Sequence, residues 1–568
     1  MAYRSVMTDT PSVAALADRV LELVLEAEPL EATLLGFRHL DGQLADLSIE
    51  HECDMVLARS EVRDSARAID RTTLSVQDRV TLDVLLALID YADDAQAAEA
   101  LDYTVAAFPV SPASMLLMYL RMIVITDATQ ADQYLQRLAQ VPRYLAQAGQ
   151  RLHRGREAGL TPVARLVDMA VEQIDRFLAT RPSPMALTPP AGWNGAEEWR
   201  ALLASVLERD VFPAFEAYRA ALVSDALPTA RSDSEAGLVH LPDGRERYRR
   251  LVRVHTTTDR TPEDLHETGL AVVARIHEEF AALGPELFGT SDVQEIFARL
   301  QSDPALKWTS SQEILDASEA AVRRAETVAV DWFGRVPEAM CTLEAIPELE
   351  ADSSGSAYYM PPSLDGSRPG TYYTNVSKPT ERTSFDLESV AFHEAVPGHH
   401  FQLSLALELP DLPVIRRLTM FTAYAEGWGL YAERLADEMG LYSSPLQRIG
   451  MLSADVWRAS RLVVDTGLHA FGWSRQQAID FMRTNTPVAP IDVSAEVDRY
   501  IAYPGQALSY MTGRLEIERL RASASDALGT AFDVRAFHDA VLGSGALPLS
   551  VLGDVIEAWT SRARRDGP

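Results

Sequence analysis

The chain has 568 residues, of which 47% are hydrophobic and 8% aromatic, a composition typical of a folded protein that buries a large core. Its formal net charge of −30 argues against the basic face that nucleic-acid binding needs, and against attachment to an anionic membrane surface. Two cysteines, Cys53 and Cys341, are too few for a disulfide framework or a cysteine-rich zinc site.

The N-terminal residues lack the basic region and the apolar core of a secretory signal peptide. No uncharged apolar run reaches membrane-spanning length. We therefore expect a cytoplasmic protein that has neither nucleic acid nor membrane among its partners. The sequence leaves the oligomeric state open.

Residues 11–350 predict one helix after another. In the clearest case, residues 76–92, apolar side chains recur at helical spacing. Similar segments, with acidic or Ser/Thr starts and Gly or Pro stops, are 129–158, 160–181, 195–223 and 262–284. Residues 224–244, rich in Ser, Asp, Gly and Pro, predict a boundary or a surface loop. We expect a mainly α, two-lobed protein, with a helical lobe over 1–230 and a second lobe over 231–568 that carries the site.

Two β-prone runs, residues 356–360 and 371–376, are separated by a turn-rich segment and predict a hairpin. An exposed strand can hold an extended peptide through main-chain hydrogen bonds. We therefore expect the second strand to pair with a substrate, and Tyr373 and Asn375 to set its orientation. The alternative is a hairpin that merely packs against the helices.

The stretch Ala-Phe-His-Glu-Ala-Val-Pro-Gly-His-His-Phe-Gln at 391–402 places His393 beside Glu394, with His399 and His400 beyond a Pro-Gly pair. A His-Glu dipeptide followed by another histidine offers two imidazoles to zinc and one carboxylate to a water molecule. Here a proline stands where H-E-x-x-H has its second histidine. On a straight helix His400 returns to the face of His393. A kink at the Pro-Gly pair would bring His399 round instead. The residues leave both ligands open, beside the alternative of a kinked helix with incidental histidines.

A third ligand is expected on a following helix. Residues 421–433 carry Glu426 and Glu433 two helical turns apart, on one face and among small and aromatic residues that indicate burial. An unpaired carboxylate would be costly there. The interval from His399 to Glu426 leaves room for one helix to end and the next to return. Two histidines, one glutamate and an open position are typical of a catalytic zinc site.

A later run of the chain supplies further polar and aromatic groups. His469 lies on an apolar predicted helix, and Tyr503 and Tyr510 flank a Pro-Gly turn. A phenol or an imidazole can donate to the oxyanion of a tetrahedral intermediate. Arg514 can hold a substrate carboxylate bidentately, and Gln506 is a further candidate for substrate binding. The alternative is that this run only packs.

Five motifs resemble the bacterial domain-of-unknown-function family 885: H-E-A-V-P-G-H-H-F-Q, E-G-W-G-L-Y-A-E, Y-P-G-Q-A-L-S-Y, T-P-E-D-L-H-E-T-G-L and P-G-T-Y-Y-T-N. That family is grouped with gluzincin metallopeptidases. The resemblance implies a mostly helical domain with zinc deep between two lobes. Its H-E-x-x-P-G-H motif implies His393, His399 and Glu426 as ligands and Glu394 as general base.

We therefore expect a zinc-dependent hydrolase that cleaves the amide bonds of short peptides. Glu394 would accept a proton from the attacking water. One alternative is a non-peptide amide hydrolase of specialised metabolism. Another is a non-catalytic helical binding protein that keeps a metal site. Glu394 favours catalysis, since a scaffold needs no base beside its metal.

Overall fold

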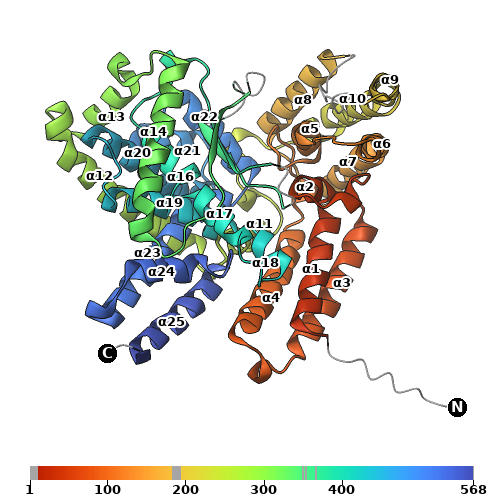
Figure 1. Ribbon diagram of the computed structural model, residues 1–568. Coiled ribbons are helices and arrows are strands. Elements are labelled where there is room, and N and C mark those ends of the chain that lie inside the picture. Colours follow the sequence, from red (N-terminus) through yellow and green to blue (C-terminus); the bar gives the residue numbers. More distant parts are fainter. Residues whose placement is uncertain (1–10, 182–192, 348–350, 352–354, 365–367, 567–568) are drawn as a thin grey trace.

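The computed structural model describes residues 11–181, 193–347, 351, 355–364 and 368–566. It confirms a mainly α protein with one small three-stranded sheet. In Figure 1 the helices α5 to α10 gather on one side and α12 to α16 with α19 to α21 on the other. None of the helices in the described ranges has the length and apolar character needed to cross a membrane.

The helices of the first 230 residues cover the predicted segments, although 129–158 and 195–223 are each divided into two α-helices. Their bounds are α1 (Val13–Ala27), α2 (Pro29–Leu35), α3 (Ile49–Arg67), α4 (Val76–Ala97), α5 (Pro112–Met122), α6 (Ala128–Leu138), α7 (Val141–Glu157), α8 (Ala164–Ala179), α9 (Ala196–Val206) and α10 (Phe212–Ala221). Several begin at a serine or aspartate, such as Ser75 before α4, whose side chain accepts a backbone N–H of the first turn. The stretch 224–244 holds short 3₁₀ turns that connect α10 to the next helix.

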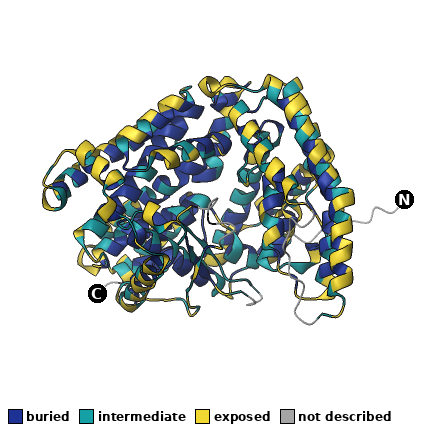
Figure 2. Ribbon diagram, turned by 90° about the horizontal axis from the view of Figure 1, so that it is seen from above, coloured by how far each residue is buried: buried dark blue, intermediate teal, exposed yellow. Residues whose placement is uncertain are grey.

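The remaining helices surround two buried ones. Their bounds are α11 (Gly244–Thr256), α12 (Pro262–Phe288), α13 (Val293–Ser302), α14 (Ser311–Trp332), α16 (Leu387–Glu394), α17 (His399–Leu407), α18 (Val414–Leu418), α19 (Thr422–Glu438), α20 (Pro445–His469), α21 (Arg475–Asn485), α22 (Pro490–Ala502), α23 (Ser509–Leu528), α24 (Val534–Leu542) and α25 (Leu549–Asp566). Helix α20 is buried on nearly all sides and packs against α12, α16, α21 and α22. Helix α19 packs against α16 and α23. Figure 2 shows that many helices are buried along one side and exposed along the other.

The sheet has the order β1-β3-β2, with β1 (Thr342–Ala345), β2 (Ala357–Met360) and β3 (Thr371–Thr374). The antiparallel pairing of β2 with β3 confirms the predicted strand pair. The expectation that the second strand receives a substrate was wrong, because β3 is central and also pairs with β1 in parallel. Its backbone groups are used on both sides. Part of the predicted turn, residues 365–367, lies outside the described residues.

Alternation along β3 places its two tyrosines on opposite faces. Tyr372 is fully buried in the core that includes α16 and α19. Tyr373, the expected substrate contact, is half-buried on the other face and stacks on Tyr358, with ring centroids 5.0 Å apart. The tyrosine that faces α16 is therefore Tyr372 and not the predicted Tyr373.

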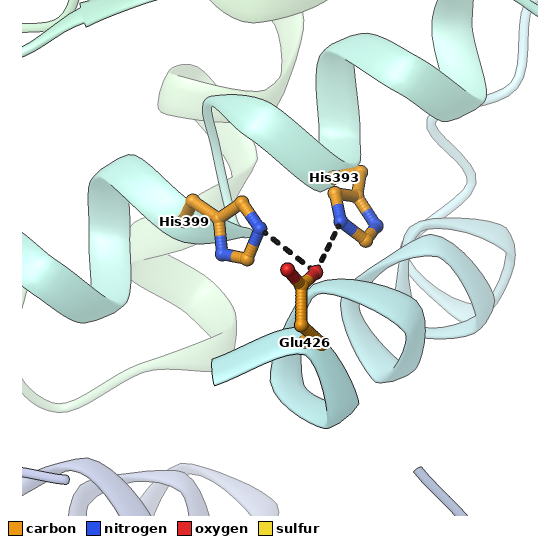
Figure 3. A group of neighbouring side chains, drawn as sticks. All are labelled: His393, His399 and Glu426. Atoms are coloured by element: carbon orange, nitrogen blue, oxygen red, sulfur yellow. Dashed lines mark ion pairs between the residues drawn. The ribbon is translucent and has the colours of Figure 1, made fainter. Parts of the chain in front are cut away.

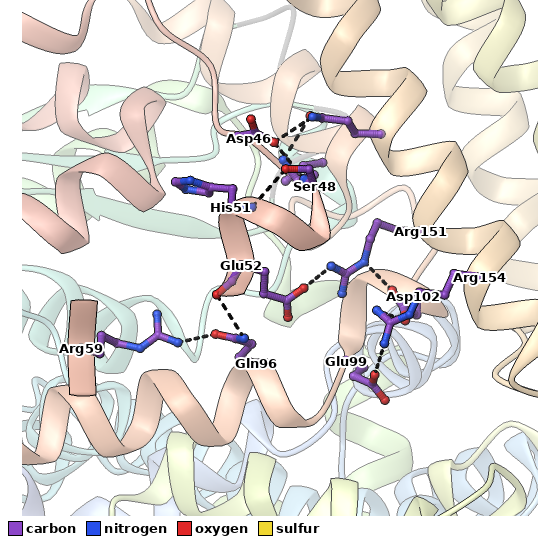
Figure 4. Close-up of polar contacts among 12 residues, drawn as sticks. Asp46, Ser48, His51, Glu52, Arg59, Gln96, Glu99, Asp102, Arg151 and Arg154 are labelled. Carbon is purple, nitrogen blue, oxygen red and sulfur yellow. Dashed lines mark hydrogen bonds and ion pairs between the residues drawn. The ribbon is translucent and has the colours of Figure 1, made fainter. Parts of the chain in front are cut away.

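Ion pairs fix the N-terminal helices to one another (Figure 4). Arg151 of α7 is buried and pairs with Asp102 and with Glu52 of α3. Arg154 pairs with Asp102 and Glu99 in the turn after α4. Because loss of one partner would leave a buried charge unpaired, this network holds α3, α4 and α7 in one arrangement.

Candidate metal centre

The helix that carries the His-Glu pair stops inside the motif. Helix α16 ends at Glu394, and α17 begins at His399. The four residues between them, Ala395–Gly398, leave the helical conformation, and the peptide bond before the proline is cis. A Cβ atom at Gly398 would lie 1.9 Å from the carbonyl oxygen of His393, so only glycine allows the loop to fold back this closely. The expected kink is thus a complete break, and His399 starts a new helix beside His393.

His393, His399 and Glu426 come together from α16, α17 and α19 (Figure 3). The Nε2 atom of each histidine lies 3.4 Å from the same Oε2 atom of Glu426. The candidate ligand atoms all lie within 4.8 Å of one another, and in the described part of the chain no other group of histidine, cysteine or acidic side chains does so. Two imidazole nitrogens and one carboxylate oxygen are ligands that zinc accepts. The three side chains therefore fit one shared cation.

Solvent reaches this cluster. The side chains of His393, His399 and Glu426 are 5%, 13% and 21% exposed, so the glutamate is the most accessible member. Burial alone would raise the pKa of Glu426, but the two imidazoles outweigh it and hold that pKa well below its ordinary value. The ligand carboxylate is therefore ionised, as metal binding requires.

His400 points away from the cluster. It is buried, its Nε2 donates to the carbonyl oxygen of Ala339 at 3.0 Å, and the hydroxyl of Tyr359 lies 3.0 Å from its Nδ1. Burial lowers the pKa of His400 to about 4, which keeps the ring neutral. Both ring nitrogens are thus engaged elsewhere, and the straight-helix alternative does not describe this site.

Glu433, to which the sequence assigned no role, orients His393. The Nδ1 of His393 donates to Oε1 of Glu433 at 2.8 Å, and the hydroxyl of Ser389 donates to the other carboxylate oxygen. Burial lowers the pKa of His393, but its hydrogen bonds with Glu426 and Glu433 outweigh that effect and raise the pKa to about 10. A metal ion bound at Nε2 would displace the proton from that nitrogen and leave the Nδ1–H on Glu433. A carboxylate on the far ring nitrogen is the usual support of a metal-ligating histidine. The signal for it in the sequence was the spacing of seven residues from Glu426 on a buried helix.

The E-G-W-G segment of α19 shapes the space around the imidazole. A Cβ atom at Gly429 would lie 2.7 Å from Cε1 and 2.8 Å from Nε2 of His393, so a side chain there would displace the ring. The indole of Trp428, fully buried, donates to the carbonyl oxygen of Pro397 at 2.9 Å and holds the loop between α16 and α17. One turn of α19 thus supplies a ligand, room for a second ligand and an anchor for the loop.

Glu394 and Tyr510 are the predicted catalytic residues that lie at the cluster. Glu394 follows His393 directly and is half-buried, and no described residue forms a hydrogen bond or ion pair with its carboxylate. The ring of Tyr510 stacks near that of His393, with centroids 6.5 Å apart and an interplanar angle of 23°. Burial raises the pKa of Tyr510, so its hydroxyl stays protonated and can donate. Gln506 is buried, and its side-chain oxygen accepts from Arg499 at 2.7 Å. Tyr503 is 38% exposed and packs edge-on against His255.

Three other predicted residues are engaged elsewhere. His469 is buried between the N–H of Leu238 and the carbonyl oxygen of Tyr500, each 3.1 Å from a ring nitrogen. Arg514 is buried and paired with Asp455 of α20. The Asn375 side chain donates to the carbonyl oxygens of residues 351 and 355 and accepts from residue 377. These contacts do not support an oxyanion role for His469 or substrate contacts for Arg514 and Asn375.

Two solved structures share the whole fold. A "putative lipoprotein" from Colwellia psychrerythraea is 26% identical and superposes with a TM-score of 0.88, covering 97% of this chain and 100% of that one. A "putative lipoprotein of unknown function" from Shewanella oneidensis is 18% identical, with a TM-score of 0.74 over 96% of this chain and 100% of that one, and it supports the fold alone. Comparison with curated proteins gives no match. The model of a family described as "Bacterial protein of unknown function (DUF885)" matches residues 29–556.

Proposed function

The chain belongs to this family, DUF885, and we propose that it is a zinc-dependent hydrolase of gluzincin type that cleaves amide bonds in short peptides. One observation carries the proposal. His393, His399 and Glu426 converge on one point, while the carboxylate next in sequence, Glu394, has no partner among the described residues. Three metal ligands beside a free base are the set that metal-assisted hydrolysis needs.

Zinc held by these three residues would supply an acidified water and a polarised scissile carbonyl. Glu394 accepts the proton of the attacking water and delivers it to the leaving amine. The hydroxyl of Tyr510, whose ring lies near that of His393, donates to the oxygen on which negative charge develops. Glu433 keeps the His393 ring in one orientation while charge moves at the site.

The absence of a partner for Glu394 among the described residues favours this proposal over a non-catalytic binding protein. In a scaffold an unpaired carboxylate beside a metal site has no function. A general base must instead remain unpaired until substrate and water arrive. A hydrolase of non-peptide amides would use the same residues, so the choice of substrate class depends on experiment.

The test combines metal analysis with digestion. We expect about one zinc per purified chain, as in catalytic sites with three protein ligands, and cleavage of a peptide library read by mass spectrometry. The Glu394→Gln variant should keep its zinc and lose about 10²- to 10⁴-fold in cleavage rate. Equal cleavage by this variant would refute the role of Glu394. A zinc-loaded wild-type chain that leaves the library intact but hydrolyses small amides would move the substrate class to non-peptide amides.

A further inference from the structure

A group of three arginines stands out in a chain with 82 acidic and 52 basic residues. Its members are Arg458 and Arg461 of α20 and Arg499 of α22. The indole of Trp457 packs against two of them, with the guanidinium carbons of Arg458 and Arg461 4.6 and 4.7 Å from its ring centroid. Such concentration of positive charge runs against the composition of the chain and calls for a local reason.

Among the described residues, the three guanidinium groups outnumber the carboxylates that pair with them. Glu496 accepts from Arg461 at 3.1 Å and from Arg499 at 3.0 and 3.2 Å, so one carboxylate serves two guanidinium groups. Arg458 has no ion pair with any described residue, and its one hydrogen bond, to the carbonyl oxygen of Ala454, is 3.5 Å long. Asp386 is within electrostatic reach of Arg458, but its carboxylate accepts from Thr383.

Two guanidinium nitrogens of this group are buried without a partner in the described ranges of the chain. They are Nη1 of Arg461, a residue only 4% exposed, and Nε of Arg458, a half-buried residue. Burying a charged donor without an acceptor is costly. An anion that reaches the accessible part of Arg458 from solvent would balance the charge of the group. Guanidinium groups pair bidentately with carboxylates and phosphates, and the group of this kind that every unmodified peptide carries is its C-terminal carboxylate.

The arginine group is separated from the metal cluster by one aromatic ring. The guanidinium carbon of Arg461 lies 4.6 Å from the centroid of the Tyr510 ring. The same ring stacks near His393 at 6.5 Å. An anionic group held by Arg461 therefore lies across one aromatic ring from His393, within a few residues of an extended peptide.

We propose that Arg458 and Arg461 form a subsite for the free carboxylate of the substrate, so that the enzyme cleaves short peptides close to their C-terminus. This inference rests on the proposed hydrolase function. In the reaction one water is consumed: the C–N bond breaks, the acyl carbon gains the hydroxyl group and the amine gains the proton. The released amine is an amino acid or a dipeptide, whose carboxylate stays on the arginines until it dissociates.

The test is a matched pair of peptides that differ only at the C-terminus, one a free carboxylate and the other an amide. Wild-type protein should prefer the carboxylate in kcat/KM by about 10- to 100-fold, as expected for a hydrogen-bonded ion pair. The preference should largely vanish in Arg458→Met, whereas cleavage of the amide peptide persists, and Arg458→Lys should retain part of it. The control is Arg448→Met on the same helix, whose guanidinium pairs with Asp437 at the surface; it should keep the full preference.

A binding measurement separates this subsite from the hydrolase proposal. Calorimetric titration of zinc-loaded Glu394→Gln with the two peptides should show tighter binding of the carboxylate form. If wild-type protein cleaves both peptides equally, the subsite is refuted and the hydrolase stands. If it cleaves neither, but the variant binds the carboxylate form more tightly, the subsite stands and the hydrolase fails. Equal binding together with no cleavage would overturn both.

Discussion

Glu433 accepts the Nδ1–H of His393 at 2.8 Å from the same helix whose Glu426 lies 3.4 Å from the Nε2 of that ring. Helix α19 therefore contacts both nitrogens of one imidazole. Because the two glutamates are seven residues apart on a rigid element, the orientation of the ring follows from the packing of α19 against α16.

This relationship predicts that Glu433 sets metal affinity. Glu433→Gln keeps the shape and an acceptor for the Nδ1–H but removes the charge, so zinc affinity should fall by about 10- to 100-fold. Titration against a competing chelator measures it. Glu438→Gln is the matched control, since Glu438 lies on the same helix and pairs with Arg521 at the surface. Equal affinities for the two variants would contradict the orienting role.

The two adjacent histidines should behave oppositely. His399→Ala should lose its zinc, because it removes one of three ligands. His400→Ala should keep zinc and lose stability instead, since the His400 ring bonds to Tyr359 and to the carbonyl oxygen of Ala339. Zinc content per folded chain, with a thermal melt, checks both. Loss of zinc in His400→Ala alone would show that the motif helix runs straight in solution.

The two candidate tyrosines differ in their distance from the chemistry. Tyr510→Phe should lower kcat by about 10²- to 10³-fold with little change in KM, since a donor to the oxyanion acts only as charge develops. Tyr503→Phe should change kcat only slightly, because the Tyr503 ring packs against His255. Steady-state kinetics on one peptide decides between them. A kcat defect confined to Tyr503→Phe would transfer the role to Tyr503.

Asp465 should make stability depend on pH. It is fully buried, accepts from Tyr248 and from the N–H of Gly505, and lies near Arg499. Burial raises the pKa of Asp465 from 3.8 to about 7, against the opposing effect of these three neighbours. Between these values the folded chain holds a proton that the unfolded chain has lost, so this group makes stability fall as pH rises, by up to about 1.4 kcal/mol per pH unit.

Asp465→Asn cannot ionise, so it should remove that contribution while keeping acceptors for Tyr248 and Gly505. The measurement is the pH dependence of unfolding between pH 4 and pH 7 in wild-type and variant protein. We expect a flatter profile in the variant. Parallel profiles would mean that Asp465 titrates at its ordinary pKa in the folded chain.

Local patterns in the sequence were enough for the helices and for part of the site. The Thr-Pro-Glu-Asp start predicted the beginning of α12 at Pro262, and the two tyrosine-rich runs predicted the antiparallel pair β2 and β3. His393 and Glu394 were recognisable because they are adjacent, and Glu426 because it is a carboxylate on a helix without charged neighbours. Each of these signals depends on a few consecutive residues.

The remaining features depend on contacts between distant segments. The break after Glu394 is held by Trp428, 31 residues away from the carbonyl group that it binds. Strand β1 was not predicted, since its partner β3 begins 29 residues later and pairs with it in parallel. In the sequence His469 and Arg514 resemble site residues, because nothing near them in the chain indicates their buried partners, Leu238 and Asp455. Burial and partner identity in such cases are properties of the assembled fold.

Gly429 has a consequence for attempts to transplant this site. The His393 ring packs directly on the backbone of α19 at Gly429. A single methyl group at Gly429 would lie 2.7 Å from Cε1 of His393, so even alanine would displace the ring. Grafting the H-E-A-V-P-G-H segment onto another helical scaffold would therefore transfer the two histidines without the space beside Gly429 that the His393 ring fills. A working graft needs a facing helix that has a carboxylate and, one turn later, no side chain at all.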